Sequence, residues 1–433
     1  MEIINLIDDF NQVSLHDPSK EIIEIYKHIK EINEVDPRGF PMVRPLFSHS
    51  DVGSFLNAVN VKREDFDWDR DFIYCVCLHH HNALAAKHLD VIPEDVLEAI
   101  RQRKCKLILD NTLEGDRVID FYTQLYFSCY MIDIPIDQVY YITNSLVAEE
   151  EHKRWKYENG TLVNDNNGLE LNVISFMYNV HDVKRLQYIG DLPDIINIDE
   201  EIEYKKANLD KIKHFLKVNR TGRPERDLFM LFINKEELYD KFLISYPEYG
   251  GYNIPPRVLP EYTTTDNIND LVKKVPFDID ETDETNHGDP GYGEGKFNAD
   301  LPFQPIHYKN SFLSTVMCAF PFVDKCCHLH SSTFNPIFCG HPVLQFGPYG
   351  HLQELKRRGF KTFNKWWDES YDLIEDGWER LKAVINITKE LSKKSPEEML
   401  EMYTEMRDVL VHNHNIIQEF DGNKFLINRI FNE

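Results

Sequence analysis

The feature that most constrains the fold is an alternation of short apolar runs with helical patterns, which occurs twice along the chain. In the first half, the strand-like runs and the helical patterns between them lie at 72–78, 93–103, 106–109, 120–131, 139–142, 146–155 and 172–178. Strands and helices that alternate at this spacing favour a parallel sheet with both faces covered. Residues 1–60 show only one amphipathic helix, Lys20 to Asn33, in an otherwise irregular sequence.

The same alternation restarts after residue 210. The predicted strands and helices lie at 214–219, 226–234, 241–245, 311–318, 333–339, 342–346 and 349–358. Residues 247–310 interrupt them with many Pro, Gly and acidic residues, which predicts a long loop or a small insertion. Helices follow at 378–392 and after Ser395, where Ser395-Pro396-Glu397-Glu398 has the form of a capping box.

Two such patterns in 433 residues predict two α/β domains and a helical C-terminus. We expect Rossmann-like parallel sheets that face each other across a cleft. The predicted boundaries are 1–190 for the first domain, 205–390 for the second with its irregular insertion at 247–310, and 395–433 for the helical segment. In open α/β sheets ligands bind beyond the carboxyl ends of the strands, so the site is sought in those loops.

Charge and composition limit the partners of this chain. The 73 acidic and 48 basic residues leave a net charge of −25, which repels the phosphates of nucleic acids and anionic membranes. No run approaches the ~20 apolar residues of a membrane span, and the first residues lack the pattern of a signal peptide. The eight cysteines are sparse and several lie in apolar runs, as in reduced proteins. We therefore expect a cytoplasmic protein without a membrane partner.

A basic island interrupts this acidic chain between Lys205 and Arg226, with eight basic and two acidic residues. Its sharper part passes from a strand through a Gly/Pro loop into a helix, and carries Lys217, Asn219, Arg220, Arg223 and Arg226. Arginine guanidinium groups bind phosphate oxygens in pairs, and a helix N-terminus adds oriented N–H donors. The arrangement suits a diphosphate. The alternative is a solvated basic loop paired with acidic neighbours.

A second segment has the composition of a ligand loop. Hydroxyl and amide side chains surround the start of a short helix, and a strand then ends in Gly347-Pro348-Tyr349-Gly350. The polar residues are Ser331, Ser332, Thr333 and Asn335. Glycines after a strand allow the backbone to approach a ligand closely.

Three segments together resemble the GT-B-fold glycosyltransferase-like proteins of phages, large viruses and bacteria. They are Phe215-Leu216-Lys217-Val218-Asn219-Arg220 with Arg223 and Arg226; Ser311-Phe312-Leu313-Ser314-Thr315-Val316; and the stretch from Thr333 through Gly340-His341-Pro342 to Asp368-Glu369-Ser370-Tyr371-Asp372. The resemblance covers about residues 205–385, with weaker echoes at 109–115 and 140–144.

The resemblance implies a metal-independent glycosyltransferase that uses a nucleotide sugar as co-substrate and needs no cofactor. Residues 205–390 would bind the donor and residues 1–190 would lie on the acceptor side. The implied donor-binding residues are Lys217, Asn219, Arg220, Arg223, Arg226, Ser331, Ser332, Thr333, Asn335, Gly347, Tyr349 and Gly350. The first candidate acceptor is a hydroxymethylated base of phage DNA, held in a locally basic cleft in the host cytoplasm. A glycan, a protein or a small molecule is the alternative acceptor.

Two departures from the family pattern affect this interpretation. Ser331-Ser332 stands where the family has Glu-Lys, and Cys318 stands where it usually has an acidic residue. In GT-B enzymes such acidic residues commonly hold the donor's ribose or sugar. Their loss implies an unusual donor, a changed binding mode, or a non-catalytic binding or scaffold protein.

Glycosyl transfer also requires a base for the acceptor hydroxyl. Asp110 and Glu114, which follow a predicted strand of the first domain, are the candidates; capping of a helix by Asp110 and a solvated Glu114 are the alternatives. Two Cys/His clusters compete as metal sites but lack the ligand spacing of zinc, so no metal site is predicted. They contain Cys75, Cys77, His79, His80, His81 and His88, and Cys326, Cys327, His328 and His330.

Overall fold

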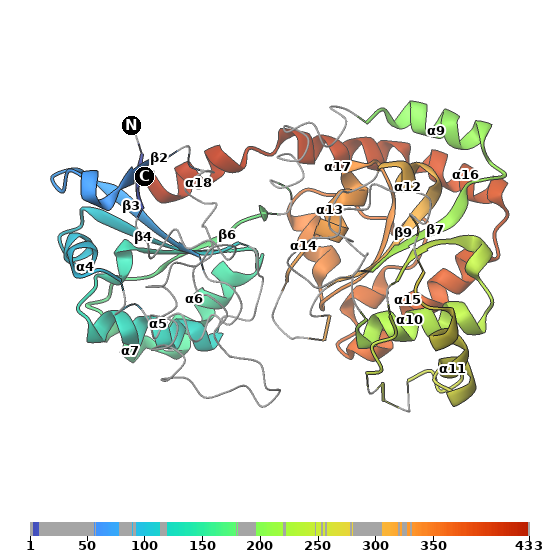
Figure 1. Ribbon diagram of the computed structural model, residues 1–433, viewed down its shortest axis with the longest axis horizontal. Coiled ribbons are helices and arrows are strands. Elements are labelled where there is room, and N and C mark those ends of the chain that lie inside the picture. Colours follow the sequence, from blue (N-terminus) through green and yellow to red (C-terminus); the bar gives the residue numbers. More distant parts are fainter. Residues whose placement is uncertain are drawn as a thin grey trace. The chain divides into compact units, whose positions relative to one another are not determined.

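The computed structural model describes residues 3–7, 56, 58–77, 89, 92–112, 119–178, 180, 196–219, 222–246, 248–252, 254–255, 258–277, 279, 305–318, 321–322, 327–329 and 331–431. The chain divides into two compact units. The first comprises residues 1–178, 325–328 and 421–433, and the second comprises 179–324 and 329–420. Each unit contains a parallel sheet, which confirms the predicted α/β class (Figure 1).

The first unit contains a sheet in the order β2-β1-β3-β4-β5-β6, in which all neighbours are parallel. Its strands are β1 (Ile4–Ile7), β2 (Val59–Lys62), β3 (Phe72–Cys77), β4 (Cys105–Asn111), β5 (Val139–Thr143) and β6 (Asn172–Ser175). Its helices include α4 (Glu94–Arg101), α5 (Ile119–Met131), α6 (Ala148–Glu158), α7 (Gly160–Asp165) and α18 (Gly422–Phe431). The last helix belongs to this unit, and the ring of Phe425 stacks on Phe176 at 6.0 Å.

The core of the first unit explains why this sequence forms a covered sheet. Strands β4 and β5 are almost wholly buried, and their centres carry the apolar runs 107–109 and 139–142, as expected for strands buried on both faces. Helix α5 packs Tyr122 and Tyr126 against Trp155 of α6, with ring centroids 5.9 and 4.7 Å apart. Aromatic pairs at these distances add to the stabilisation from buried area.

The second unit contains a four-stranded parallel sheet in the order β10-β9-β7-β8. Its strands are β7 (Lys213–Val218), β8 (Phe242–Ser245), β9 (Ser311–Met317) and β10 (Val343–Phe346). Its helices are α9 (Ile198–Ala207), α10 (Pro224–Lys235), α11 (Thr265–Lys274), α12 (Pro305–Lys309), α13 (Ser331–Phe338), α14 (His351–Arg357), α15 (Gly377–Ser392), α16 (Pro396–Glu405) and α17 (Arg407–Glu419). Figure 1 shows α10 and α15 on one side of this sheet and α9, α16 and α17 on the other.

Several elements differ from the sequence predictions. Strands β1 and β2 lie in the stretch where no strand is predicted, and α9 was not predicted either. Within residues 247–310, where a loop or small insertion is predicted, the structure has the helices α11 and α12. The predicted capping box is present: the backbone N–H of Glu398 donates to Ser395 Oγ at 3.2 Å, and the N–H of Ser395 donates to Glu398 at 2.7 Å.

Candidate functional site

The candidate site lies at the carboxyl ends of β7, β9 and β10, which parallel pairing brings to one edge of the second sheet. Phe215 and Leu216 of β7 pair with Leu313 and Ser314 of β9, and Met317 of β9 pairs with Phe346 of β10. The polar residues that follow these three strands are therefore neighbours, although more than a hundred residues separate β7 from β10.

Lys217 occupies the carboxyl end of β7 and is fully buried. Its ammonium group, Nζ, has no hydrogen-bond partner among the described residues and lies 4.9 Å from the ring centroid of Phe229 on α10. Burial, followed by the nearby Arg226, lowers the pKa of Lys217 well below its usual value. Two residues further along the chain, Asn219 is also buried, and its Nδ2 has no partner within the described part of the chain. Two buried donors at this edge therefore lack acceptors.

Helix α10 starts directly after these residues. Arg223 is its N-cap residue and Pro224 occupies its first turn, where the missing N–H of proline is harmless. Glu225 is 2% exposed, and its Oε1 has no hydrogen-bond partner among the described residues but lies 4.0 Å from Arg226 Nε. Burial raises the pKa of Glu225, against the opposing effects of its own backbone N–H and then of Arg226, Arg223 and Lys217. Basic and acidic side chains, Lys217 and Glu225, are thus both buried at the start of α10, where little solvent reaches them.

The loop between β7 and α10 is held by a close backbone approach. A Cβ atom on Gly222 would lie 2.7 Å from the backbone nitrogen of Gly250, so any other residue would force the two segments apart. Asp227, one turn into α10, accepts hydrogen bonds from the Tyr246 hydroxyl and from the N–H of Gly250. These contacts fix the loop that carries Arg223. Arg220 lies outside the described residues.

At the carboxyl ends of β9 and β10, a small polar network surrounds Cys318. Gln345 Nε2 donates to Cys318 Sγ at 2.7 Å and to Thr333 Oγ1 at 2.9 Å, and the Thr333 hydroxyl lies 3.8 Å from the sulfur. Burial raises the pKa of Cys318 to about 11, so it is a thiol at neutral pH. The position where the resembling family has an acid is therefore filled by a neutral side chain.

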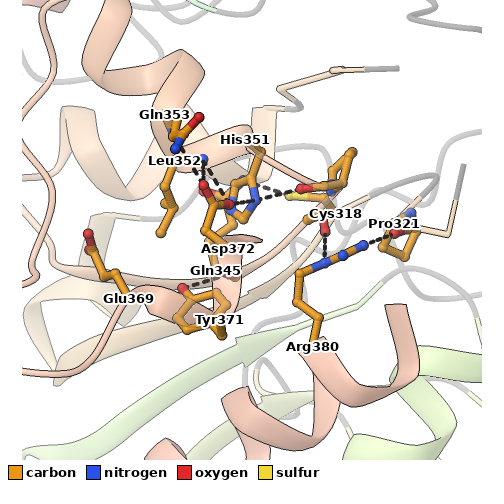
Figure 2. Close-up of polar contacts among 12 residues, drawn as sticks. Cys318, Pro321, Gln345, His351, Leu352, Gln353, Glu369, Tyr371, Asp372 and Arg380 are labelled. Atoms are coloured by element: carbon orange, nitrogen blue, oxygen red, sulfur yellow. Dashed lines mark hydrogen bonds and ion pairs between the residues drawn. The ribbon is translucent and has the colours of Figure 1, made fainter. Parts of the chain in front are cut away.

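The loop after β10, Gly347 to Gly350, is held in place by the buried side chains of His351 and Asp372 (Figure 2). His351 Nδ1 lies 2.8 Å from Asp372 Oδ1 and 2.9 Å from the carbonyl oxygen of Pro348. Since both partners are acceptors, Nδ1 carries the proton. Asp372 also accepts from the backbone N–H groups of Leu352 and Gln353. Burial acts to raise the pKa of Asp372, but His351 and these N–H groups lower it overall.

Arg380 of α15 holds the same loop from another direction. Its Nε donates to the carbonyl oxygen of Gly347 at 3.0 Å, and an Nη donates to that of Pro321 at 2.6 Å. The other Nη donates to the carbonyl oxygens of Ile374 and Glu375. A single buried guanidinium therefore joins the ends of β9 and β10 to the start of α15.

The remaining predicted donor-binding residues differ in their exposure to solvent. Thr333 is fully buried in the Cys318 network, whereas Ser332 and Asn335 are half-buried on α13 and Ser331 is its first residue. Tyr349 is exposed, and Gly350 has a φ of 75°, which favours glycine. The sequence prediction missed Glu225, Gln345, Asp372 and Arg380 as parts of this site. The first could have been noticed, because it is one of only two acidic residues in the basic island.

The predicted base belongs to the first unit. Asp110 lies at the carboxyl end of β4 and is 2% exposed, and its Oδ1 accepts from the backbone N–H and the hydroxyl of Thr112 at 3.0 and 2.8 Å. These bonds resemble the capping alternative, and its role as a base stays a prediction. Glu114 lies outside the described residues, as do His79, His80, His81 and Cys326. Among the residues that the structure describes, no three acidic, Cys or His side chains form a metal site.

We expect replacement of Lys217 by methionine to raise the free energy of unfolding of the ligand-free protein by about 1–3 kcal/mol, because it removes a buried charge without a partner. The native pKa of this lysine is lowered, so the folded state binds fewer protons than the unfolded state. The advantage of K217M is therefore full at low pH and shrinks as the pH rises toward the unfolded pKa, about 10.4. Urea unfolding at pH 6, 8 and 10 measures it; a destabilised K217M would show that the amine has a partner.

Comparisons with known proteins give similarity only at the level of whole structures. No protein-family model matches the chain, and no curated protein matches it. One similar structure is the N-terminal domain of trehalose-6-phosphate phosphatase from Candida albicans, with 9% identity, a TM-score of 0.43, and coverage of 98% of this chain and 78% of that one. Another is an E. coli structure described as trehalose-6-phosphate bound with UDP-2-fluoro glucose, with 11% identity, a TM-score of 0.35, and coverage of 100% and 99%.

Proposed function

We propose that this chain is a GT-B-like glycosyltransferase that binds the diphosphate of a nucleotide sugar at the carboxyl end of β7 and the start of α10. One observation carries the proposal: buried donors at this edge, Lys217 Nζ and Asn219 Nδ2, have no acceptor within the described residues. Burying an unpaired polar or charged group is costly, and such groups cluster at functional sites. A nucleotide sugar, which carries acceptor oxygens on both its phosphates and its hydroxyl groups, would satisfy them.

The chemistry of a diphosphate leaving group fits the charges around these donors. Arg223 and Arg226 flank the first turn of α10, and Arg220 precedes them in the sequence. Guanidinium groups and a helix N-terminus stabilise negative charge as the bond to the sugar breaks, so no metal ion is required for this step. The glycine-containing loop after β10, fixed by Arg380 and Asp372, lies at the same sheet edge. The acceptor hydroxyl would lose its proton to Asp110 or Glu114 of the first unit.

Loss of the arginines tests the donor site. We expect Arg223→Ala and Arg226→Ala each to weaken binding of a nucleotide sugar by about 1.5–3 kcal/mol, the usual contribution of a hydrogen bond to a charged group. Calorimetry with UDP-glucose, GDP-mannose and ADP-glucose measures this. Arg407→Ala is the control, because Arg407 pairs with Asp199 on the surface, on the opposite side of the sheet from α10. Unchanged affinity in both variants, with the fold intact, would place the donor elsewhere.

The acceptor is proposed from the resemblance, with a hydroxymethylated base of phage DNA as the first candidate. The net charge of −25 opposes DNA binding, so DNA would need a locally basic surface. A gel shift at low and moderate salt tests this acceptor, and its failure would leave a glycan, a protein or a small molecule. Release of free sugar from a nucleotide sugar separates an enzyme from a non-catalytic binding protein, the alternative that Cys318 raises.

The helices that the structure describes include none with the length and apolar character of a membrane span.

A further inference from the structure

Lys217 of β7 and Glu225 of α10 are both close to Phe229 of α10. Glu225 and Phe229 are four residues apart on this helix and therefore share a face. Lys217 Nζ lies 4.9 Å from the ring centroid of Phe229, so the amine contacts the face of α10 that carries Glu225. The amine and the carboxyl group are close enough for each charge to affect the pKa of the other.

These two groups nevertheless do not satisfy each other. Lys217 Nζ and Glu225 Oε1 are both buried without a hydrogen-bond partner among the described residues, and the two side chains form no ion pair within 4.0 Å. The amine lacks an acceptor, and the carboxylate oxygen lacks a donor. A phosphate oxygen would satisfy the amine but would repel the carboxylate. A hydroxyl group both accepts and donates, so it can satisfy both at once.

We propose that Lys217 and Glu225 together bind a hydroxyl group of the donor, either on the ribose of its nucleotide or on the transferred sugar. Lys217 Nζ would donate to the hydroxyl oxygen, and the hydroxyl would donate to Glu225 Oε1. Glu225 would thereby supply, from the start of α10, the carboxylate that is absent at the neutral Cys318. This inference rests on the proposed function, and it makes the pair a specificity determinant for hydroxylated donors.

In this arrangement the arginines would hold the phosphates, and the pair would hold the hydroxyl. Glu225 lies among Lys217, Arg223 and Arg226, each of which opposes the raising of its pKa by burial. Its Oε1 lies 4.0 Å from Arg226 Nε, beyond hydrogen-bond distance. Arg223 and Arg226 have more exposure than Lys217 and can reach a diphosphate outside the pair. The competing occupant is a water molecule, which could bridge the same two atoms.

Calorimetry on matched ligands separates these possibilities. UDP, GDP and ADP are compared on the full chain, and the tightest of them is then compared with its 2′-deoxy and 3′-deoxy analogues. A second arm compares UDP-glucose with its monodeoxy analogues at the sugar. We expect Glu225→Met to weaken binding of the hydroxylated ligand about tenfold or more, and to leave binding of one deoxy analogue unchanged. The arm in which the selective loss occurs identifies the ribose or the sugar.

Variants of the pair provide the controls. Glu225→Gln retains an acceptor oxygen and is expected to recover part of the lost affinity. Lys217→Met should show the same selectivity for the same hydroxyl, which keeps the test decisive if Glu225→Met does not fold. Glu151→Met removes another buried glutamate, on α6 of the first unit, and should not change the selectivity.

The outcomes distinguish this inference from the proposed function. Equal losses for hydroxylated and deoxy ligands, or no loss at all, would overturn the inference and indicate that the pair holds only water. Binding of nucleotides to the wild-type chain would then still support the donor site. If the wild-type chain binds neither the nucleoside diphosphates nor UDP-glucose, the proposed function fails and this inference falls with it.

Discussion

Replacement of Arg380 by methionine should lower the free energy of unfolding by about 5 kcal/mol, because four buried or partly buried carbonyl groups would lose a charged donor, each at roughly 1–3 kcal/mol. These oxygens belong to Gly347, Pro321, Ile374 and Glu375, and the Arg380 side chain is almost fully buried. A methionine of similar length fills the space but donates nothing. The guanidinium also lies 5.8 Å from the ring centroid of Phe346, a contact that would be lost as well.

Urea unfolding of R380M against two controls measures this effect. Arg380→Lys keeps the charge but can reach fewer of the four oxygens, so its loss should be intermediate. Arg407→Met removes a half-exposed arginine that is paired with Asp199, and such surface pairs contribute little. The expectation is wrong if R380M and R407M unfold at the same urea concentration. A large loss for R380M would show that the contacts of Arg380 with the loop after β10 and with its other carbonyl partners stabilise the fold.

The alternation of apolar runs was sufficient to predict eight of the strands and the parallel class of both sheets, because strands buried on both faces usually carry an apolar run. Strands β1 and β2 escaped prediction for the opposite reason. β2, Val59–Lys62, is largely exposed at the edge of its sheet, so its sequence carries no apolar run. β1, Ile4–Ile7, is only four residues long and contains the polar Asn5, which pairs with Asn60 across the two strands.

The strand and the helix that carry the candidate site could be predicted from the sequence, but the environments of the individual side chains could not. The strand–loop–helix pattern of 214–234 places basic residues at the end of β7, and the structure has that arrangement. Sequence spacing does not reveal which side chains are buried, since this depends on the helices that cover each face. Lys205 and Lys217 belong to one basic island in the sequence, yet the first lies on α9, across the sheet from α10 (Figure 1). From residue type alone, Lys205 and Lys217 would be predicted to have the same role.

Lys205 has the opposite environment to Lys217, although both side chains are fully buried. Its Nζ donates to the carbonyl oxygens of Tyr308, Lys309 and Ser311 at 2.8, 2.8 and 2.6 Å, which matches the three protons of an ammonium group. The ring of Tyr403 lies 4.9 Å from the same nitrogen. Burial lowers the pKa of Lys205 to about 7, but every donor is satisfied. This lysine connects α9 to α12 and to the start of β9.

Lys205→Met should therefore lower the free energy of unfolding by about 4 kcal/mol, since three buried carbonyl groups would lose their donor at roughly 1–3 kcal/mol each. Lys206→Met is the matched control: the neighbouring side chain is 66% exposed, and its removal should change little. The decisive comparison is with K217M, in which the same substitution at the same degree of burial should stabilise the ligand-free protein. If the two substitutions change the free energy of unfolding in opposite directions, Lys205 stabilises the fold, whereas Lys217 is available to bind a ligand. Equal destabilisation would mean that Lys217 is also structural, and would remove the observation on which the donor site rests.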